Sequence, residues 1–187
     1  QFYGVILNET DRMTRIVKDL LTLSRLDSAK MDWKTETFSL KKSVENAYKA
    51  MEMEARRHNH KLIMSVDSSL PMFSGDRERI EQVLINLISN AVKYTPDGGK
   101  IEYSAENCED HIKITVKDNG IGIPQQDRER IFERFYRVDK SHSKQSGGTG
   151  LGLSIVKHAV QYHHGKITVE SEANNGTTIS VLFDPRV

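Results

Sequence analysis

The stretch IEQVLINLISNAVKYTPDGG, residues 80–99, contains one face of a helix, the end of that helix and the turn after it. Its apolar residues recur three and four positions apart, as on one side of an α-helix. They are Ile80, Val83, Leu84, Leu87, Ile88 and Ala91. The run Pro96-Asp97-Gly98-Gly99 ends the helix and turns the chain. We therefore expect a helix over residues 76–95 that packs its apolar face on a core.

The opposite side of this helix carries a set of polar side chains at i, i+4, i+7 and i+8, so that they share one face. They are Asn86, Asn90, Lys93 and Tyr94. An Asn carboxamide oxygen suits a hard cation such as Mg²⁺, and a Lys ammonium can meet phosphate oxygens as a point charge. Because polar faces are the rule on surface helices, this motif alone fits an ordinary solvated face better.

The pattern around this helix is α/β. Helical spacing recurs over residues 40–57 and 151–164, and apolar residues alternate as a short strand over 62–66. Alternation at 101–105 and 112–116 predicts an antiparallel hairpin, and alternation at 167–169 and 179–183 predicts a second one. These elements predict an α+β fold, a two-layer α/β sandwich with a mixed, mainly antiparallel sheet.

Residues 1–27 carry a heptad-like stripe in which Ile6, Met13 and Leu20 are seven apart. The stripe predicts a helix about 40 Å long. It either packs on another helix or folds onto its own domain, and periodicity leaves both open. We expect three parts: this helix over 1–28, a polar linker over 29–39 and a domain over 40–187. Because the first residue already lies in a helical pattern, we expect the chain to be part of a longer protein.

Charge, cysteine content and histidine spacing limit the partners and the sites that this chain is expected to have. With 27 Lys and Arg against 26 Asp and Glu, the net charge of +1 gives no reason to expect nucleic acid as a partner. The single cysteine, Cys108, excludes a disulfide framework within the chain and fits a reducing compartment. The histidine pairs 58/60 and 163/164 lack helical metal-ligand spacing, and we expect them on the surface.

Two glycine-containing stretches follow. DNGIGIP, residues 118–124, comes directly after a strand, where Asp118 can accept a hydrogen bond from an exocyclic amine. Alone, it fits a tight turn better. GGTGLGL, residues 147–153, opens a helix, and backbone N–H groups at such a start can hold phosphate. Four glycines in six residues favour that functional interpretation. The stretch matches neither a Walker A loop nor the dinucleotide fingerprint.

The 22 residues between Pro124 and Gly147 divide into two halves. The first half holds Ile131, Phe132, Phe135 and Tyr136, which predict a short helix, and the second half is polar and basic. Loops of this length inside a compact domain are usually functional or disordered. A mobile lid over a polyphosphate explains the composition and the flanking glycines.

Together these blocks strongly resemble the ATP-binding domain of bacterial sensor histidine kinases. Four motifs carry the resemblance in family order: residues 86–96, 118–124, 131–137 and 148–153, which look like the N, G1, F and G2 boxes. Residues 8–28 resemble the second helix of the family's dimerisation hairpin, most like the cell-wall and phosphate-responsive kinases of Gram-positive bacteria. The resemblance implies the Bergerat ATP-binding fold, preceded by a long N-terminal helix.

The resemblance also implies roles. Asn90 would bind the Mg²⁺ that bridges the phosphates, with Asn86 beside it, and Asp118 would receive the adenine amino group. Lys93 and Arg137 would be the catalytic residues, each approaching phosphate. The remaining nucleotide-binding residues that it implies are Tyr94, Gly120, Gly122, Ile123, Gly148, Thr149, Gly150, Leu151 and Gly152.

One position separates activities within the wider superfamily. Its ATP-hydrolysing members place a Glu four residues before the metal-binding Asn, whereas this chain has Asn86, which cannot act as a base. The site therefore looks built to hold ATP for transfer. None of the seven histidines has the context of the family's acceptor histidine, so self-phosphorylation by this chain alone is not expected.

The resemblance implies a cytoplasmic protein-histidine kinase that uses ATP and Mg²⁺. Its partners would be a second copy, through the dimerisation hairpin, and the receiver domain of a response regulator. Contact with a membrane would come only through parts of the parent outside this chain. Two alternatives remain: a nucleotide-binding regulatory module without transfer, and a serine kinase of the anti-sigma type on the same fold.

Overall fold

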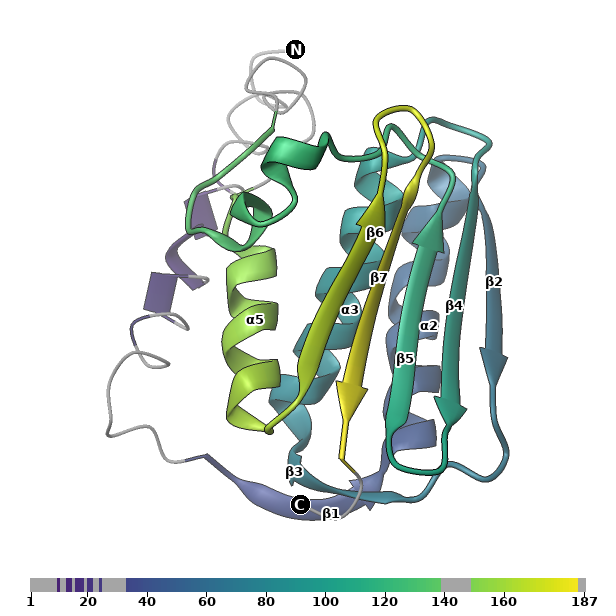
Figure 1. Cartoon of the computed structure of the whole chain (residues 1–187), viewed down its shortest axis with the longest axis vertical. Coiled ribbons are helices and arrows are strands. Elements are labelled where there is room, and N and C mark those ends of the chain that lie inside the picture. The colour runs from purple at the N-terminus through teal and green to yellow at the C-terminus, as the bar shows by residue number, and fades with distance from the viewer. Residues whose placement is uncertain are drawn as a thin grey trace.

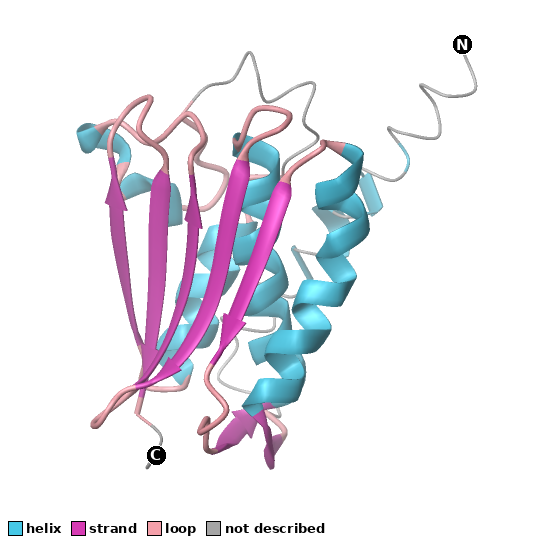
Figure 2. Ribbon diagram, turned by 90° about the vertical axis from the view of Figure 1, so that its right-hand side faces the viewer, coloured by secondary structure: helices cyan, strands magenta, loops and turns pink. Residues whose placement is uncertain are grey.

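The computed structural model describes residues 33–138 and 149–184, with isolated residues between 10 and 24. A five-stranded sheet forms one layer, and three helices cover one of its faces as the second layer (Figures 1 and 2). The predicted two-layer sandwich is confirmed. Its interior holds one large apolar cluster, to which the helices contribute one face each and the sheet contributes alternate residues.

The sheet has the strand order β2-β4-β5-β7-β6. Its strands are β2 (Lys61–Val66), β4 (Lys100–Asn107), β5 (Ile112–Asp118), β6 (Lys166–Ser171) and β7 (Thr177–Phe183). β2 pairs with β4 in parallel, and all other pairs are antiparallel. The mixed, mainly antiparallel sheet and both predicted hairpins are therefore confirmed. The register places the last residue of β5, Asp118, opposite the first residue of β7, Thr177.

The helices are α2 (Leu40–Arg57), α3 (Arg77–Tyr94) and α5 (Gly152–Tyr162), within one or two residues of the predicted ranges. The Ser39 hydroxyl caps α2, and the Asp76 carboxylate caps α3 by accepting from the backbone N–H of Arg79. The apolar face predicted for α3 is buried along its whole length, from Ile80 to Val92. This burial leaves the polar side of α3 facing away from the sheet.

A second, two-stranded sheet was not predicted. β1 (Thr35–Ser39) pairs antiparallel with β3 (Met72–Asp76), immediately before α2 and α3 respectively. Polar residues in β1 and Pro71, Ser74 and Gly75 in or beside β3 hide the alternation that marks a strand. β1 lies within the stretch predicted as a linker, before residue 40, and it pairs with β3 beyond that residue. The division of the chain at residue 40 remains a proposal.

Other expectations need correction. His60 and His163 are each only 7% exposed, so that one member of each histidine pair is buried and not on the surface. The short helix expected around Ile131 is two 3₁₀ turns, η1 (Gln125–Asp127) and η2 (Arg130–Phe132), which end before Phe135 adopts a left-handed φ of 63°.

The long N-terminal helix falls mostly outside the described residues. Those described between 10 and 24 are helical, and Met13, Val17, Leu20 and Leu21 among them are exposed. In the part of the chain that the structure describes, no helix is long and apolar enough to cross a membrane.

Candidate nucleotide-binding site

The loop after β5 is fastened to the end of α3. The N–H of Ile121 donates to the carbonyl of Tyr94 at 3.1 Å. A Cβ on Gly120 would lie 2.3 Å from that same carbonyl oxygen, so only glycine allows this approach. Two of the motifs predicted from the sequence, residues 86–96 and 118–124, are therefore in direct contact.

The other side of this loop is held by the turn between β6 and β7. The N–H groups of Asn174 and Gly176 donate to the carbonyls of Ile121 and Gly120, at 2.7 and 3.0 Å. Gly122 has a φ of +67°, and a Cβ there would lie 1.8 Å from the carbonyl oxygen of Glu172. The glycines are thus required by the packing of the loop itself, between α3 and the β6–β7 turn.

Asp118 is half-buried at the end of β5, with its two carboxylate oxygens in different situations. Oδ1 accepts from the backbone N–H of Gly120 at 2.8 Å and of Thr177 at 3.2 Å. No described residue donates to Oδ2. Burial raises the pKa of Asp118, and the two backbone donors oppose that rise. The carboxylate is therefore held in place by one oxygen while the other is left for a hydrogen-bond donor.

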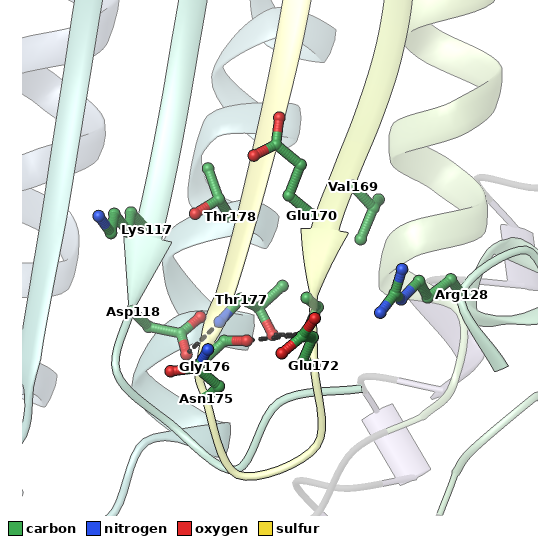
Figure 3. Close-up of a pocket in the computed structure, with 11 residues that line it drawn as sticks. Lys117, Asp118, Arg128, Val169, Glu170, Glu172, Asn175, Gly176, Thr177 and Thr178 are labelled. Atoms are coloured by element: carbon green, nitrogen blue, oxygen red, sulfur yellow. Dashed lines mark hydrogen bonds between the residues drawn. The ribbon is translucent and has the colours of Figure 1, made fainter. Parts of the chain in front are cut away.

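A pocket of about 340 Å³ opens beside Asp118, at the ends of β5, β6 and β7 (Figure 3). Ser171 and Thr177 line it, with their hydroxyls 2.9 Å apart, and Arg128, the residue after η1, borders it. The pocket does not extend to Asn86, Asn90 or Lys93. The motifs at residues 118–124 and 86–96 therefore meet through the backbone contact between Ile121 and Tyr94, but they do not line one common cavity.

The polar face of α3 meets the start of α5. The Asn86 side-chain N–H donates to the carbonyl of Gly152 at 3.3 Å, which leaves its Oδ1 for another partner. Asn90 lies one turn further along the same face and is half-buried. Two amide oxygens one helical turn apart are ligands of the kind that Mg²⁺ binds. Within residues 33–138 and 149–184, no group of three or more His, Cys, Asp or Glu side chains is gathered for a metal.

The end of α3 brings two cations near one phenol. The Lys93 ammonium lies 4.8 Å from the centroid of the Tyr94 ring. Burial raises the pKa of Tyr94, and the nearby charge of Arg137 lowers it by a smaller amount. Lys93 therefore lies beside Tyr94, and the charge of Arg137, from a motif over 40 positions further along the sequence, acts on the same phenol.

The segment that follows η2 contacts the loop at the start of α5. The N–H of Phe135 donates to the carbonyl of Gly150 at 2.9 Å, and Gly150 has a φ of +73°. Thr149 accepts from the N–H of Leu151 through its hydroxyl at 3.2 Å. Leu151 is fully buried. Gly148 lies outside the described residues.

Two contributors were missed by the sequence analysis. The backbone N–H of Thr177 donates to Asp118. The hydroxyl of Ser171 forms a hydrogen bond with the hydroxyl of Thr177 and also accepts from the N–H of Ile123 at 2.8 Å. The turn Asn174-Asn175-Gly176 marks in the sequence where β7 begins, but a local pattern does not reveal that Thr177 pairs with Asp118. Neighbouring Asn119 accepts from the N–H of Lys100 at 2.7 Å and so serves the sheet.

Comparisons with known proteins agree with this arrangement. Residues 75–187 match the family model described as "Histidine kinase-, DNA gyrase B-, and HSP90-like ATPase". The chain is 42% identical over 182 residues to the sensor histidine kinase WalK of Bacillus subtilis, covering 96% of this chain and 30% of that protein. Similar structures include full-length ShkA in complex with AMPPNP (27% identity, TM-score 0.83, 98% of this chain and 38% of that chain). The histidine kinase ThkA in complex with the response regulator TrrA is also similar (29%, 0.78, 98% and 50%).

The chain spans less than a third of the length of its Bacillus relative. The matched family model covers more than half of this chain and contains all four motifs and all of α3. The chain therefore belongs to the histidine kinase-, DNA gyrase B- and HSP90-like ATPase family, and over nearly its whole length it is similar to part of a sensor histidine kinase.

Proposed function

We propose that this chain binds Mg-ATP with the adenine at Asp118 and donates the γ-phosphoryl group to a histidine of a dimerisation domain. The observation that carries the proposal is Asp118 itself. Its Oδ1 is held by two backbone N–H groups, and its Oδ2 faces no described donor at the mouth of a pocket. A fixed acceptor of this kind matches an exocyclic amino group such as that of adenine.

The phosphates and the metal belong at the junction of α3 and α5. Asn90 would hold Mg²⁺ through its amide oxygen, with Asn86 Oδ1 beside it. Helix α5 begins at Gly152 without a side-chain cap, so that its first N–H groups and its dipole favour an anion. Bound Mg²⁺ would neutralise charge on the phosphates, while Lys93 and Arg137 would orient the group to be transferred. Thr149 and Gly150 would support it from the loop before α5.

The residue beside the proposed phosphate position favours transfer of the phosphoryl group to another protein group over hydrolysis by water. Asn86 occupies the position at which a carboxylate would activate water, and its amide is already engaged with Gly152. A site that positions ATP without a base for water suits a nucleophile brought by another domain. The complex of ThkA with TrrA supports a response-regulator receiver domain as the next acceptor. Dimerisation, a cytoplasmic location and anchoring of the parent in the membrane belong to the same proposal.

A titration tests the adenine site. We expect Asp118→Asn to weaken ATP binding about 10- to 100-fold, because the substitution replaces a charged acceptor with an amide that can present its N–H₂ to the base. The measurement is calorimetric titration with ATP, with and without Mg²⁺. Asp110→Asn, an exposed Asp in the β4–β5 turn, is the matched control and should bind as wild type does. Equal affinities of Asp118→Asn and wild type would refute the assignment.

A second experiment separates the kinase from a module that only senses nucleotide. The chain would be incubated with labelled ATP, Mg²⁺ and a dimerisation hairpin that carries the acceptor histidine. Label that appears on the hairpin, is stable in base and is lost in acid identifies a phosphohistidine and supports the kinase. Base-labile, acid-stable label on a serine of a partner would favour the anti-sigma type. Tight ATP binding with no label would favour the sensing module.

A further inference from the structure

Trp33, the first residue of the long described segment, is held against the far end of α5. Its ring stacks on that of Tyr162, with the centroids 3.5 Å apart and the planes 7° from parallel. Its edge also meets His163 at 5.8 Å and 85°. Because the next residues form β1, this contact fixes the point at which the chain enters the domain.

The backbone beside Trp33 is held as well. The N–H of Lys34 donates to Asp76 Oδ2 at 3.2 Å, while Asp76 Oδ1 caps α3. The backbone N–H of Asp76 in turn donates to Nε2 of His163 at 2.9 Å. The entering chain is therefore fixed twice, by a ring on α5 and by a hydrogen bond to the first turn of α3.

The surface that receives Trp33 combines the closely packed ring of His163 with the ring of Tyr162, which is 41% exposed. His163 is 7% exposed, its Nδ1 is 2.7 Å from the carbonyl of Ala159, and its ring packs on Phe73 and Phe183. A Cβ on Gly75 would lie 2.6 Å from the His163 ring, so the backbone of β3 closes over it. We name Tyr162, His163 and Asp76 the entry dock. A well-packed dock transmits position, whereas a loose surface would let the chain pivot.

Helix α5 joins this dock to the nucleotide site. At its first residue, Gly152 accepts from Asn86, and at its last residue, Tyr162 stacks on Trp33. Figure 1 shows β1 at the end of the molecule where α5 finishes, opposite the end that carries the loops of the nucleotide site. One 11-residue helix therefore contacts the nucleotide site at its first residue and the entering chain at its last.

We propose that Trp33 is a positioning residue for phosphoryl transfer. Its stack on Tyr162 sets where the catalytic domain stands relative to the residues that precede it, and so where bound ATP stands relative to the acceptor histidine. The inference rests on the proposed kinase function. Losing the stack should slow transfer about tenfold without changing ATP affinity, because proximity and orientation are lost while every nucleotide contact remains.

The dock itself can be observed in this chain, because Trp33 is its only tryptophan. We expect wild-type Trp33 to be protected from acrylamide quenching and Tyr162→Ala to increase that quenching. Met53→Ala, which removes an exposed side chain on α2, is the control and should leave quenching unchanged. Equal quenching of wild type and Tyr162→Ala would show that the stack does not exist in solution and would overturn the proposal.

The catalytic arm uses the chain extended at its N-terminus by an acceptor helix taken from the Bacillus relative. Wild type, Tyr162→Ala, Trp33→Ala and Trp33→Phe would be compared in phosphohistidine formation at varied ATP. We expect a lower kcat with an unchanged KM for ATP in both Ala variants, and recovery in Trp33→Phe, whose ring still stacks. A double-mutant cycle between Trp33 and Tyr162 should show that the two losses do not add.

The outcomes are distinguishable. Unchanged kcat in both Ala variants, with the quenching of Tyr162→Ala showing an open dock, would overturn the positioning role and leave the proposed kinase function unaffected. A raised Kd for ATP in calorimetry, equal to the loss of rate, would show a merely structural role of α5. No phosphohistidine from the wild-type extended chain, with the dock intact, would overturn the proposed function and with it this role.

Discussion

At the scale of the residue, Asp118 and His163 show how backbone donors fix a titratable side chain. Two N–H groups hold Asp118 Oδ1, and the N–H of Asp76 holds His163 Nε2. Because His163 Nδ1 faces the carbonyl of Ala159, this nitrogen carries the proton and Nε2 must be the acceptor. The ring is therefore held in the neutral form, whereas Asp118 is an acceptor for a ligand.

This neutral histidine predicts a pH dependence of stability. Burial is the main cause that lowers the pKa of His163 below its ordinary 6.5, and the carbonyl of Ala159 and the charge of Asp76 oppose the effect. The unfolded chain binds the proton more readily, so the free energy of unfolding should be fully supported above pH 6.5 and fall as the pH drops towards the lowered pKa. Urea unfolding between pH 7.5 and 5.5 measures the slope.

The matched variants are His163→Gln, which should flatten that slope, and His164→Gln at its exposed neighbour. His164→Gln should retain most of the slope, because the charge of His164 is the smallest of the causes that act on the pKa of His163. Gln can still accept from the N–H of Asp76, so the variant removes the titration and keeps an acceptor. A slope that persists unchanged in His163→Gln would assign the pH dependence to other groups.

At the scale of the element, α3 is the helix on which the domain depends. Its inner face lies in the core, its polar face meets α5, and its last carbonyl holds the loop after β5. Its first turn is capped by Asp76, which also receives the N–H of Lys34. Displacing α3 would therefore affect the nucleotide site and the entering chain together.

We expect Asp76→Ala to lower the free energy of unfolding by about 2 kcal/mol, because a nearly buried cap and a second acceptor are lost together. Ser39→Ala, which removes the cap of α2 at an exposed hydrogen bond of 3.3 Å, should cost about 0.5–1 kcal/mol. Chemical denaturation of both variants measures the difference. An equal loss in the two variants would show that Asp76 acts only as a cap.

At the scale of the whole molecule, the site depends on segments far apart in the sequence. Asp118, Gly152 and Tyr94 come from three elements, and the β6–β7 turn closes the arrangement from a fourth. A ligand that contacts several of these elements at once should resist their separation, and so should stabilise the fold as a whole.

We therefore expect ATP with Mg²⁺ to raise the melting temperature. At about 100 times the dissociation constant the gain is about 2.7 kcal/mol, which corresponds to several degrees for a chain of this size. Removal of Mg²⁺ with EDTA should reverse most of the shift, because the phosphates then lose their bridge to Asn90. Thermal denaturation with ATP, with ATP and EDTA, and with neither provides the test. A shift of the same size without Mg²⁺ would contradict a role for the metal.

The sequence by itself determined the helices and the two hairpins, because each depends on local spacing. The site residues that the resemblance implies stay a prediction. The face of α3 that is buried follows from periodicity, and the glycines around Asp118 and Gly150 stand out in composition. The resemblance to sensor histidine kinases rests on the same local motifs, and the comparisons confirm it.

Only the tertiary structure decided which distant groups meet. The pairing of β1 with β3, the register that sets Thr177 against Asp118, and the stack of Trp33 on Tyr162 join residues at least 33, 59 and 129 positions apart. Such contacts leave no local pattern, because each partner alone looks like an ordinary turn, linker or surface residue. The burial of His163 has the same cause: the aromatic rings around it come from β3, α5, β7 and the entering chain.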